Sequence, residues 1–352
     1  MKVFSDYHHS GLYFSLHLLF EERLGWELFR PIGMEWFPDW WDIAKPYGQN
    51  ESTAKQYLEI RDSEPFYAPI DGSPVLNSIV DRKPDYYVIQ EIAHNYKQKA
   101  MTFQQFLDTD IDIIIASIPD HWVTYTKLRD MYKPKAKVIC QSGNIFWENE
   151  ELIRNGTVKN LMASTKRFDL PKGIHNVFYH QEQPVIPYEP IKKTGNISSY
   201  THLLPLPGLY EEYSRVLPQY NWRAYGAGCP NGLIHKLEDI YQNMKDSDMV
   251  YNVKPRGDGF GWIWHSAFMV GRPVITNFSD YVDKLGGELF EDGVTGINLE
   301  AKTVQENADM IRKFFDENYV EKMGENARKR WEQVVNYDEE FGVLQKFLER
   351  LI

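Results

Sequence analysis

The residues best suited to binding a charged ligand lie between positions 254 and 274, in the stretch KPRGDGFGWIWHSAFMVGRPV. Two cations, Lys254 and Arg256, come first, and Asp258 follows them within a glycine-rich turn. Glycine lets backbone N–H groups approach a ligand closely, and the apolar helix expected next begins with partial positive charge. This combination predicts a loop and a helix N-terminus that receive an anion.

A second set of candidates lies in the N-terminal half. Asp120 and His121 follow IDIIIASI, the strongest apolar run of the chain, at residues 111–118. Such a run is typical of a central parallel strand, and the carboxyl ends of parallel strands are where ligands bind. His121 is therefore a candidate catalytic residue. The alternative is a packed or solvated loop histidine.

Further polar residues fall at the same kind of position. His8, His9 and Gly11 lie in the first strand-to-helix loop, and Ser142 and Asn144 follow the strand expected over 137–143. The two histidines could hydrogen-bond a phosphate or a hydroxyl group, or be surface residues without a role. No third ligand with recognisable spacing accompanies them, so no metal site is predicted.

Alternating strand and helix patterns position these residues in the first half of the chain. Residues 34–75 interrupt the rhythm as an aromatic-rich insertion, for which short helices are expected. The predicted strands cover 2–5, 26–32, 86–92, 111–118, 137–143, 160–165 and 176–180, and the predicted helices cover 12–24, 123–132 and 147–154. This order predicts a parallel α/β sheet.

The alternation of strands and helices resumes after residues 182–194. This segment contains three prolines and is predicted to be a linker. Strands are expected over 195–200, 221–228, 248–254, 272–277 and 295–299, with helices over 209–217, 233–244 and 259–270. Two α/β domains of similar size therefore emerge. The ligand-binding ends of their sheets are expected to meet in a cleft.

The second half also carries a family resemblance. The order GFG (259–261), helix, GRPVI (271–275), LFEDGVTG (289–296) and MGENAR (323–328) resembles the donor-binding domain of GT-B glycosyltransferases of the retaining, GT4-like group 1 type. The resemblance implies two Rossmann-like domains, 1–187 and 195–335, facing across a cleft. It also implies that residues 336–352 form a helix crossing back to the N-terminal domain.

The resemblance implies roles for the candidate residues. Donor binding is assigned to Gly11, Gly226, Gly228, Lys254, Arg256, Gly259, Phe260, Gly261 and Ser266, acceptor binding to His8, Asp120, Ser142 and Asn144, and catalysis to His9, His121 and Asp258. Asn277, Ser279 and Asp280 fall where the family contacts the donor sugar. Lys254 and Arg256 would hold the diphosphate, although a solvated pair at a strand end is the alternative.

Two positions depart from the family pattern. Ser266 stands where a glutamate clamps the nucleotide ribose, and a serine cannot form a bidentate carboxylate contact. The family's Arg and Lys near the first strand of the second domain are replaced by SSYTH at 198–202. These departures imply an unusual donor contact or a site that has lost activity.

The implied reaction moves a sugar from a nucleotide-sugar, a UDP-sugar first, to an acceptor hydroxyl with retention and without a metal. No cofactor is expected beyond this co-substrate. The acceptor is a glycan, a lipid-linked or a small molecule. Three alternatives remain: glucosylation of a hydroxylated DNA base as in phages, a non-catalytic sugar-nucleotide or glycan binder, and a sugar-nucleotide epimerase.

The amino-acid composition limits which of these functions is expected. The net charge of −11 argues against a surface that coats nucleic acid, although Lys127, Arg129, Lys133, Lys135 and Lys137 could form a basic rim or a solvated helix face. Two cysteines exclude a disulfide framework. The sequence has neither a signal peptide nor an apolar run of the ~18 residues needed to span a bilayer, so a cytoplasmic protein is expected.

Overall fold

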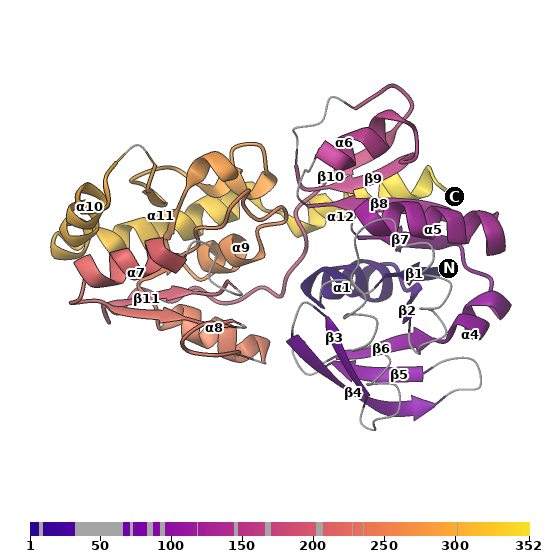
Figure 1. Cartoon of the computed structure of the whole chain (residues 1–352), viewed down its shortest axis with the longest axis horizontal. Coiled ribbons are helices and arrows are strands. Elements are labelled where there is room, and N and C mark those ends of the chain that lie inside the picture. Colours follow the sequence, from indigo (N-terminus) through magenta and orange to yellow (C-terminus); the bar gives the residue numbers. More distant parts are fainter. Residues whose placement is uncertain are drawn as a thin grey trace. The chain divides into compact units, whose positions relative to one another are not determined.

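The computed structural model of the chain describes residues 1–6, 10–31, 66–70, 73–82, 87–91, 96–117, 119–143, 147–165, 170–201, 207–226, 228–234, 236–300 and 302–352. Residue contacts divide the chain into unit 1 (1–163, 168–182 and 341–352) and unit 2 (164–167 and 183–340) (Figure 1). The main chain thus enters unit 2 inside the proline-rich segment 182–194 and returns to unit 1 at residue 341.

Unit 1 is built on one sheet with the strand order β10-β9-β8-β7-β1-β2-β6-β5-β4-β3. The seven strands from β10 to β6 are parallel, and the last three continue antiparallel. The strands are β1 (Lys2–Ser5), β2 (Glu27–Pro31), β3 (Phe66–Ile70), β4 (Ser73–Arg82), β5 (Tyr87–Glu91), β6 (Tyr96–Met101), β7 (Ile113–Ala116), β8 (Lys137–Ser142), β9 (Asn160–Ala163) and β10 (His175–Phe178). The helices are α1 (Ser10–His17), the π-helical turn η1 (Leu18–Arg23), α4 (Phe103–Asp108), α5 (Pro119–Tyr132), α6 (Trp147–Arg154) and α12 (Tyr337–Glu349) from residue 341 onward.

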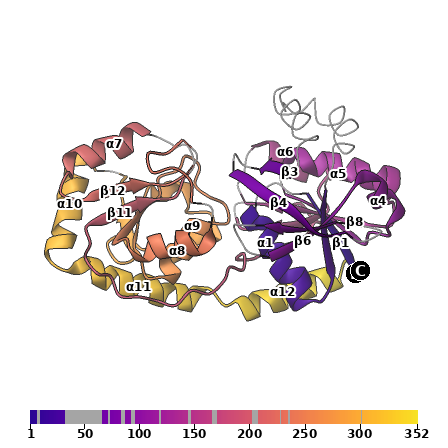
Figure 2. The same cartoon turned by 90° about the horizontal axis from the view of Figure 1, so that it is seen from below.

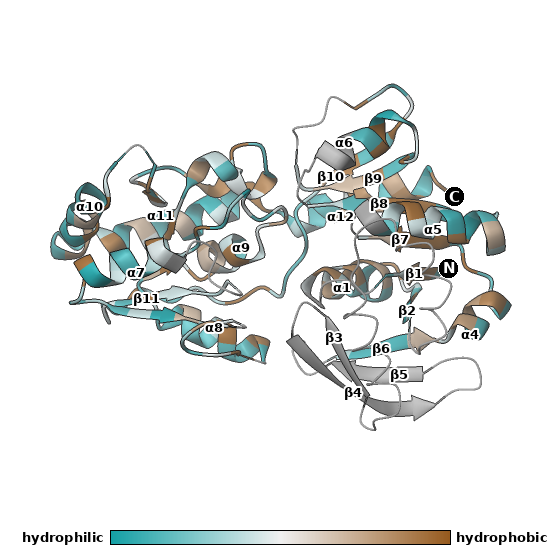
Figure 3. Cartoon of the chain, viewed as in Figure 1, coloured by the Kyte–Doolittle hydropathy of each residue, from teal (hydrophilic) through white to brown (hydrophobic). Residues whose placement is uncertain are grey.

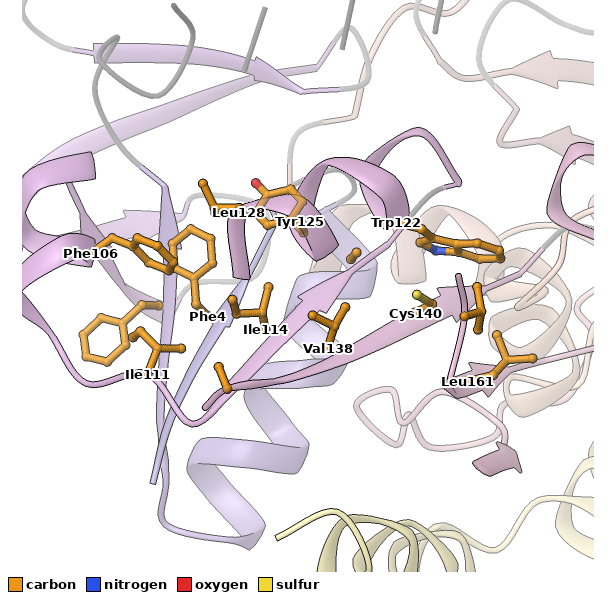
Figure 4. Close-up of a cluster of buried hydrophobic side chains, with 14 of the residues drawn as sticks. Phe4, Phe106, Ile111, Ile114, Trp122, Tyr125, Leu128, Val138, Cys140 and Leu161 are labelled. Atoms are coloured by element: carbon orange, nitrogen blue, oxygen red, sulfur yellow. The ribbon is translucent and has the colours of Figure 1, made fainter. Parts of the chain in front are cut away.

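The core of unit 1 lies between the central strands and α5 (Figure 4). Trp122, Tyr125 and Leu128 project from one side of α5 toward strand residues such as Ile114 and Val138. Their spacing of three residues places them on a single helical face. Figure 3 shows hydrophilic and hydrophobic residues alternating along α5, as expected for a helix that covers a sheet on one side only. This packing fixes the start of α5 at the carboxyl edge of β7.

Unit 2 is built on a five-stranded parallel sheet with the order β12-β11-β13-β14-β15. Its strands are β11 (Asn196–Ser199), β12 (Asn221–Ala224), β13 (Met249–Tyr251), β14 (Val274–Thr276) and β15 (Gly296–Asn298). Its helices are α7 (Pro207–Val216), α8 (Leu237–Lys245), α9 (Trp262–Met269), η3 (Phe278–Asp280), η4 (Leu285–Leu289), α10 (Val304–Asp316) and α11 (Tyr319–Val334). Helices α7 and α10 pack side by side at one end of the unit (Figure 2).

Most predicted elements are confirmed, and the differences are informative. The strands expected over 2–5, 111–118 and 137–143 are β1, β7 and β8. Within the insertion expected over 34–75, the described part is strand rather than short helix, because β3 pairs with β4 as a hairpin; residues 34–65 lie outside the described part of the chain. Strand β6 was not expected, since its sequence YKQKAM contains three polar residues in a row and lacks the alternation typical of a strand.

Helix α12 is held on unit 1 by two aromatic contacts. His175 on β10 stacks on Phe347 at 4.4 Å between ring centroids, and its Nε2 lies 2.9 Å from the Phe347 carbonyl oxygen. The guanidinium of Arg23 lies 5.2 Å from the ring centroid of Phe341 and donates to Glu182 at 2.6 and 2.7 Å. A C-terminal helix that returns to the first unit was predicted, and the structure confirms it.

Acid stability of unit 1 should depend on Glu21. Burial alone would raise the pKa of this carboxyl, but hydrogen bonds from His17 (2.7 Å) and Lys99 (2.8 Å) lower it overall. A lowered folded-state pKa stabilises the fold above the unfolded glutamate value of 4.5, and this contribution is lost as the pH falls through the folded value. We expect Glu21→Gln to lower the free energy of unfolding by about 1.5 kcal/mol at pH 7 and to flatten its decline below pH 4.5.

Urea denaturation at pH 7 and at several acidic pH values measures this difference. Glu22→Gln is the control, because the side chain of Glu22 is 63% exposed and contacts the same histidine, His17, at 3.3 Å. Equal losses in the two variants at pH 7 would contradict the assignment of the acid-sensitive contact to Glu21.

Candidate functional site

The loop of residues 254–261 joins β13 to α9 in unit 2 and has an unusual backbone. Arg256 (φ 65°), Gly257 (φ 68°) and Gly261 (φ 63°) all occupy the left-handed region. A side chain at position 257 would place its Cβ 2.3 Å from the backbone carbonyl oxygen of Asp280. Glycine is therefore required there by both conformation and space. The loop is fixed in shape by its packing on the segment around Asp280.

Charged side chains surround this loop. Lys254 Nζ lies 3.7 Å from Asp258 Oδ1, and the backbone N–H of Arg256 donates to Asp280 Oδ1 at 3.0 Å. Lys284 is buried, donates to the Asp280 carbonyl oxygen and lies 3.6 Å from Asp283 Oδ1. The ammonium groups of Lys254 and Lys284 thus each lie near a carboxylate, and an incoming anion would compete with Asp258 for Lys254. Lys284 was not predicted, because it lies thirty residues from Lys254 in the sequence.

The loop ends at the start of α9. Gly261 occupies the N-cap position and makes no side-chain capping bond. The first-turn N–H groups of a helix lack intrahelical acceptors, and together with the helix dipole they favour an anion. Gly259 is buried and Phe260 is half-buried in the same turn. The structure therefore brings together Lys254, Arg256, Asp258 and the glycine turn at one place.

Ser266, on the second turn of α9, lies elsewhere. It is 3% exposed, and its hydroxyl donates to Gln183 Oε1 at 2.8 Å. Burial raises the pKa of the neighbouring Tyr241, and a hydrogen bond with Ser266 lowers it to a smaller extent. A ribose contact by Ser266 would require the bond with Gln183 to open. The hydroxyl of Ser266, the residue that departs from the family pattern, thus already has a hydrogen-bond partner within the protein.

The other unit 2 candidates lie at strand ends. Gly226 and Gly228 form a turn after β12, in which the Gly226 N–H donates to the Gly232 carbonyl at 2.8 Å. Beside this turn, Tyr225 stacks on Tyr200, with 5.8 Å between centroids. Ser279, after β14, is held by Glu300, to which both its N–H (2.8 Å) and its hydroxyl donate. These contacts order the loops, and the donor roles of Gly226, Gly228 and Ser279 stay predictions.

The carboxyl edge of the unit 1 sheet holds a buried polar network. Asp6 follows β1, Ser117 follows β7, and His121 lies in the first turns of α5; they are 2%, 8% and 4% exposed. Asp6 Oδ2 accepts the backbone N–H of Ser117 at 2.7 Å and lies 2.5 Å from His121 Nδ1. Asp6 Oδ1 accepts the Ser117 hydroxyl. The hydroxyl bonds the aspartate rather than the histidine, so the arrangement is not that of a serine nucleophile.

The described side chains around this network are buried. Burial first, and the charge of Asp6 second, raise the pKa values of Tyr125 and of the Cys140 thiol above their usual ranges. Gln141, at the end of β8, extends the network: its Nε2 donates to Tyr179 Oη at 3.0 Å, and its Oε1 lies 3.4 Å from the Ser117 hydroxyl. Charge–dipole contacts are stronger in such a medium than in water.

The other unit 1 candidates are placed only in part. Ser142 ends β8 and is 2% exposed, and Gly11 is buried in α1. Asp120 is the second residue of α5, directly before His121, and only its backbone position is described. His8, His9 and Asn144 lie outside the described residues. Asp6 was not predicted as a site residue, although its position directly after the first strand could have indicated it.

Among the described residues, no group of three or more His, Cys, Asp or Glu side chains could hold a metal ion. Nor does any helix in the described ranges combine the length and the apolar composition that a membrane span requires. The expected independence from metals stays a prediction.

Comparison with known proteins identifies the fold. No protein-family model and no curated protein sequence matches the chain. Among solved structures, HepE from Anabaena in complex with UDP and glucose is similar, with a TM-score of 0.65 and 13% identity over 99% of this chain and 100% of that one. Sucrose-phosphate synthase from Thermosynechococcus elongatus has a TM-score of 0.63 and 10% identity, covering 100% and 99% of the two chains.

A mutant of S. aureus TarM, in complex with Fondaparinux, alpha-GlcNAc-glycerol and UDP, is similar at a TM-score of 0.60 and 11% identity, covering 99% of each chain. These structures have the GT-B fold. The coverage of both chains in each comparison, together with the two parallel sheets, shows that this chain has the GT-B fold as predicted.

Proposed function

We propose that the chain is a glycosyltransferase that transfers a sugar from a nucleotide-sugar, a UDP-sugar first, to an acceptor hydroxyl. The observation that carries this proposal is the 254–261 loop, where two cations and an uncapped helix start meet on the GT-B fold. The diphosphate would lie against these N–H groups, with Lys254 and Arg256 neutralising the charge that grows as it leaves. UDP is named in the HepE and TarM complexes, which supports uridine as the base.

The proposed acceptor is a glycan or another polyol. Support comes from the TarM complex, whose molecules include a glycan and a glycerol glycoside. We assign the acceptor hydroxyl to unit 1, where His121 lies at the carboxyl edge of β7 with Ser142 at the end of β8. Transfer with retention and without a metal is part of the proposal and follows from the family resemblance. Proton NMR of the anomeric product and activity in EDTA test these two points.

A donor panel tests the proposal directly. Thermal unfolding is measured with UDP, GDP, ADP, CMP and dTDP sugars, beginning with UDP-glucose and UDP-N-acetylglucosamine. A donor present at about 100 times its Kd stabilises by roughly 2.7 kcal/mol. Replacing Lys254 and Arg256 with alanine together should weaken donor binding by at least roughly 100-fold, because charge-assisted hydrogen bonds contribute about 1.5–3 kcal/mol each and about 1.4 kcal/mol is a factor of ten.

Lys313→Ala is the matched control, since this lysine of α10 is 65% exposed and 3.9 Å from Glu317 on the surface. Full donor-induced stabilisation in the double variant would refute the diphosphate assignment. No stabilisation of the unsubstituted protein by any nucleotide-sugar would refute the proposed function.

The alternatives have distinct outcomes in the same assays. Two cations of the proposed DNA rim have partners in the protein, since Arg129 bonds Asp130 at 2.6 Å and Lys133 donates to the Leu107 carbonyl at 2.7 Å. DNA labelling that depends on salt would nevertheless favour a DNA acceptor. Conversion of the donor without any acceptor would indicate an epimerase. Donor binding without transfer or hydrolysis would indicate a binder.

A further inference from the structure

A buried asparagine lies where the 254–261 loop leaves the sheet of unit 2. Asn252 directly follows β13 and is 1% exposed. Its Oδ1 accepts two hydrogen bonds, from Trp264 Nε1 at 3.0 Å and from the Tyr281 hydroxyl at 2.6 Å. An indole N–H only donates, so the atom that faces Trp264 must be the amide oxygen. One side chain therefore connects the end of β13 to α9 and to the segment after η3.

The two aromatic partners of Asn252 form a stacked pair. The rings of Trp264 and Tyr281 lie 3.9 Å apart between centroids with 21° between their planes, and both side chains are fully buried. Burial, and then the charges of Asp258 and Asp280, raise the pKa of Tyr281. A hydrogen bond with the Asp258 backbone opposes this rise. The Tyr281 hydroxyl therefore stays protonated at neutral pH, and it connects Asn252 to the loop.

The loop is hydrogen-bonded at three successive residues. The Arg256 N–H donates to Asp280 Oδ1 at 3.0 Å, and the Gly257 N–H donates within the turn at 2.9 Å. The third bond joins the Asp258 backbone to Tyr281. Since Asp280 and Tyr281 are consecutive, a displacement of the Tyr281 ring would also move the acceptor of the Arg256 N–H. The shape of the loop thus depends on how firmly Tyr281 is held.

We propose that Asn252 is a positioning residue for the donor: its amide oxygen holds Trp264 and Tyr281, and through them it keeps the 254–261 loop in the shape that receives the diphosphate. The inference rests on the proposed function for the diphosphate, and the fixed loop stands on the hydrogen bonds alone. A loop that is already ordered costs the ligand no ordering free energy. An asparagine also supplies the acceptor without a negative charge, which would repel the diphosphate.

Two substitutions test the connection from Asn252 to the loop. Asn252→Ala removes the shared acceptor, whereas Tyr281→Phe removes only the hydroxyl and keeps the stacked ring. Calorimetric titration with UDP, at a temperature where every variant is folded, measures affinity. Hydrogen–deuterium exchange with mass spectrometry measures the order of the peptide that contains residues 256–258.

We expect the Kd for UDP to rise roughly 10-fold in Asn252→Ala, because a loop that holds the binding shape about a tenth of the time binds tenfold more weakly. Its peptide should exchange at least roughly 10-fold faster. Tyr281→Phe should raise the Kd by roughly 3-fold, as expected for one lost hydrogen bond. The double variant should bind UDP no more weakly than Asn252→Ala alone.

Asn307→Ala is the matched control. Asn307, on α10, is also fully buried, and its Nδ2 donates to the Tyr213 hydroxyl and to the Leu299 carbonyl at 2.9 Å each. Tyr213 and Leu299 belong to one hydrophobic cluster of unit 2, whereas Trp264 and Tyr281 belong to another. The control should lose stability in urea denaturation, but its Kd for UDP and its loop exchange should stay within about twofold of the unsubstituted protein.

An unchanged Kd for UDP or an unchanged loop exchange in Asn252→Ala would overturn the proposal, as would equal effects in Asn307→Ala. Where Asn252→Ala does not fold, Tyr281→Phe decides by the same two measurements. Absence of UDP binding in the unsubstituted protein would overturn the uridine donor of the proposed function, and the loop exchange would still test the positioning.

Discussion

Replacing Gly257 with alanine is expected to destabilise unit 2 by about 3 kcal/mol or more and to abolish donor-induced stabilisation. The new Cβ would lie 2.3 Å from the Asp280 carbonyl oxygen and 3.1 Å from Lys284 Nζ, so the backbone must move. The left-handed conformation contributes about 1–2 kcal/mol of this loss and overpacking a further ~1–3 kcal/mol. Urea denaturation measures the stability, and thermal shift with a UDP-sugar measures binding.

Gly293→Ala is the matched control for this substitution. Gly293 has nearly the same conformation (φ 73°), but nothing lies within 4 Å of an added Cβ. It should lose only the conformational part, about 1 kcal/mol. Similar losses at positions 257 and 293 would show that the close packing on Asp280 does not determine the shape of the 254–261 loop.

Replacing Arg272 with methionine is expected to lower the stability of unit 2 by about 3–5 kcal/mol. The arginine is fully buried, and its guanidinium donates to the carbonyls of Glu189 (2.6 Å), Val270 (2.6 Å) and Lys245 (2.5 Å). Burial lowers its pKa, and the charge of Asp248 opposes this shift. Without the guanidinium, these carbonyls and that carboxylate lose their buried donor and countercharge.

Arg215→Met is the corresponding surface control, because Arg215 of α7 is exposed. Its effect on urea denaturation should stay within about 0.5 kcal/mol. A loss below about 1 kcal/mol in Arg272→Met would contradict the role assigned to the buried guanidinium.

The sequence predicts the parallel strands well for a physical reason. A strand such as β7 is buried on both faces, so it becomes a continuous apolar run that stands out from its surroundings. Strand β6 shows the limit of this reasoning. Gln98 on this strand is 1% exposed, and Lys99 bonds Glu21 at 2.8 Å. Because these buried or paired residues are polar, their sequence resembles that of an exposed segment.

The candidate site was predictable only as a set of loops. His121 was expected at a strand end, but its partner Asp6 lies 115 residues earlier, and the pairing depends on β1 lying beside β7. Strand order is not encoded in local periodicity. Lys284 was missed for the same reason, because it is distant in the sequence and only the folded chain places its Nζ beside residue 257. The motif at 254–261 was visible because it is contiguous.

The return of the chain to unit 1 at residue 341 has a consequence for biosynthesis. Residues 341–352 are translated after all of unit 2. Unit 1 therefore lacks these helical residues at a time when the sequence of unit 2 is already complete. The ring of His175 then lacks its stacking partner on the ribosome until Phe347 emerges. The segment made first is thus the one whose folding is completed last.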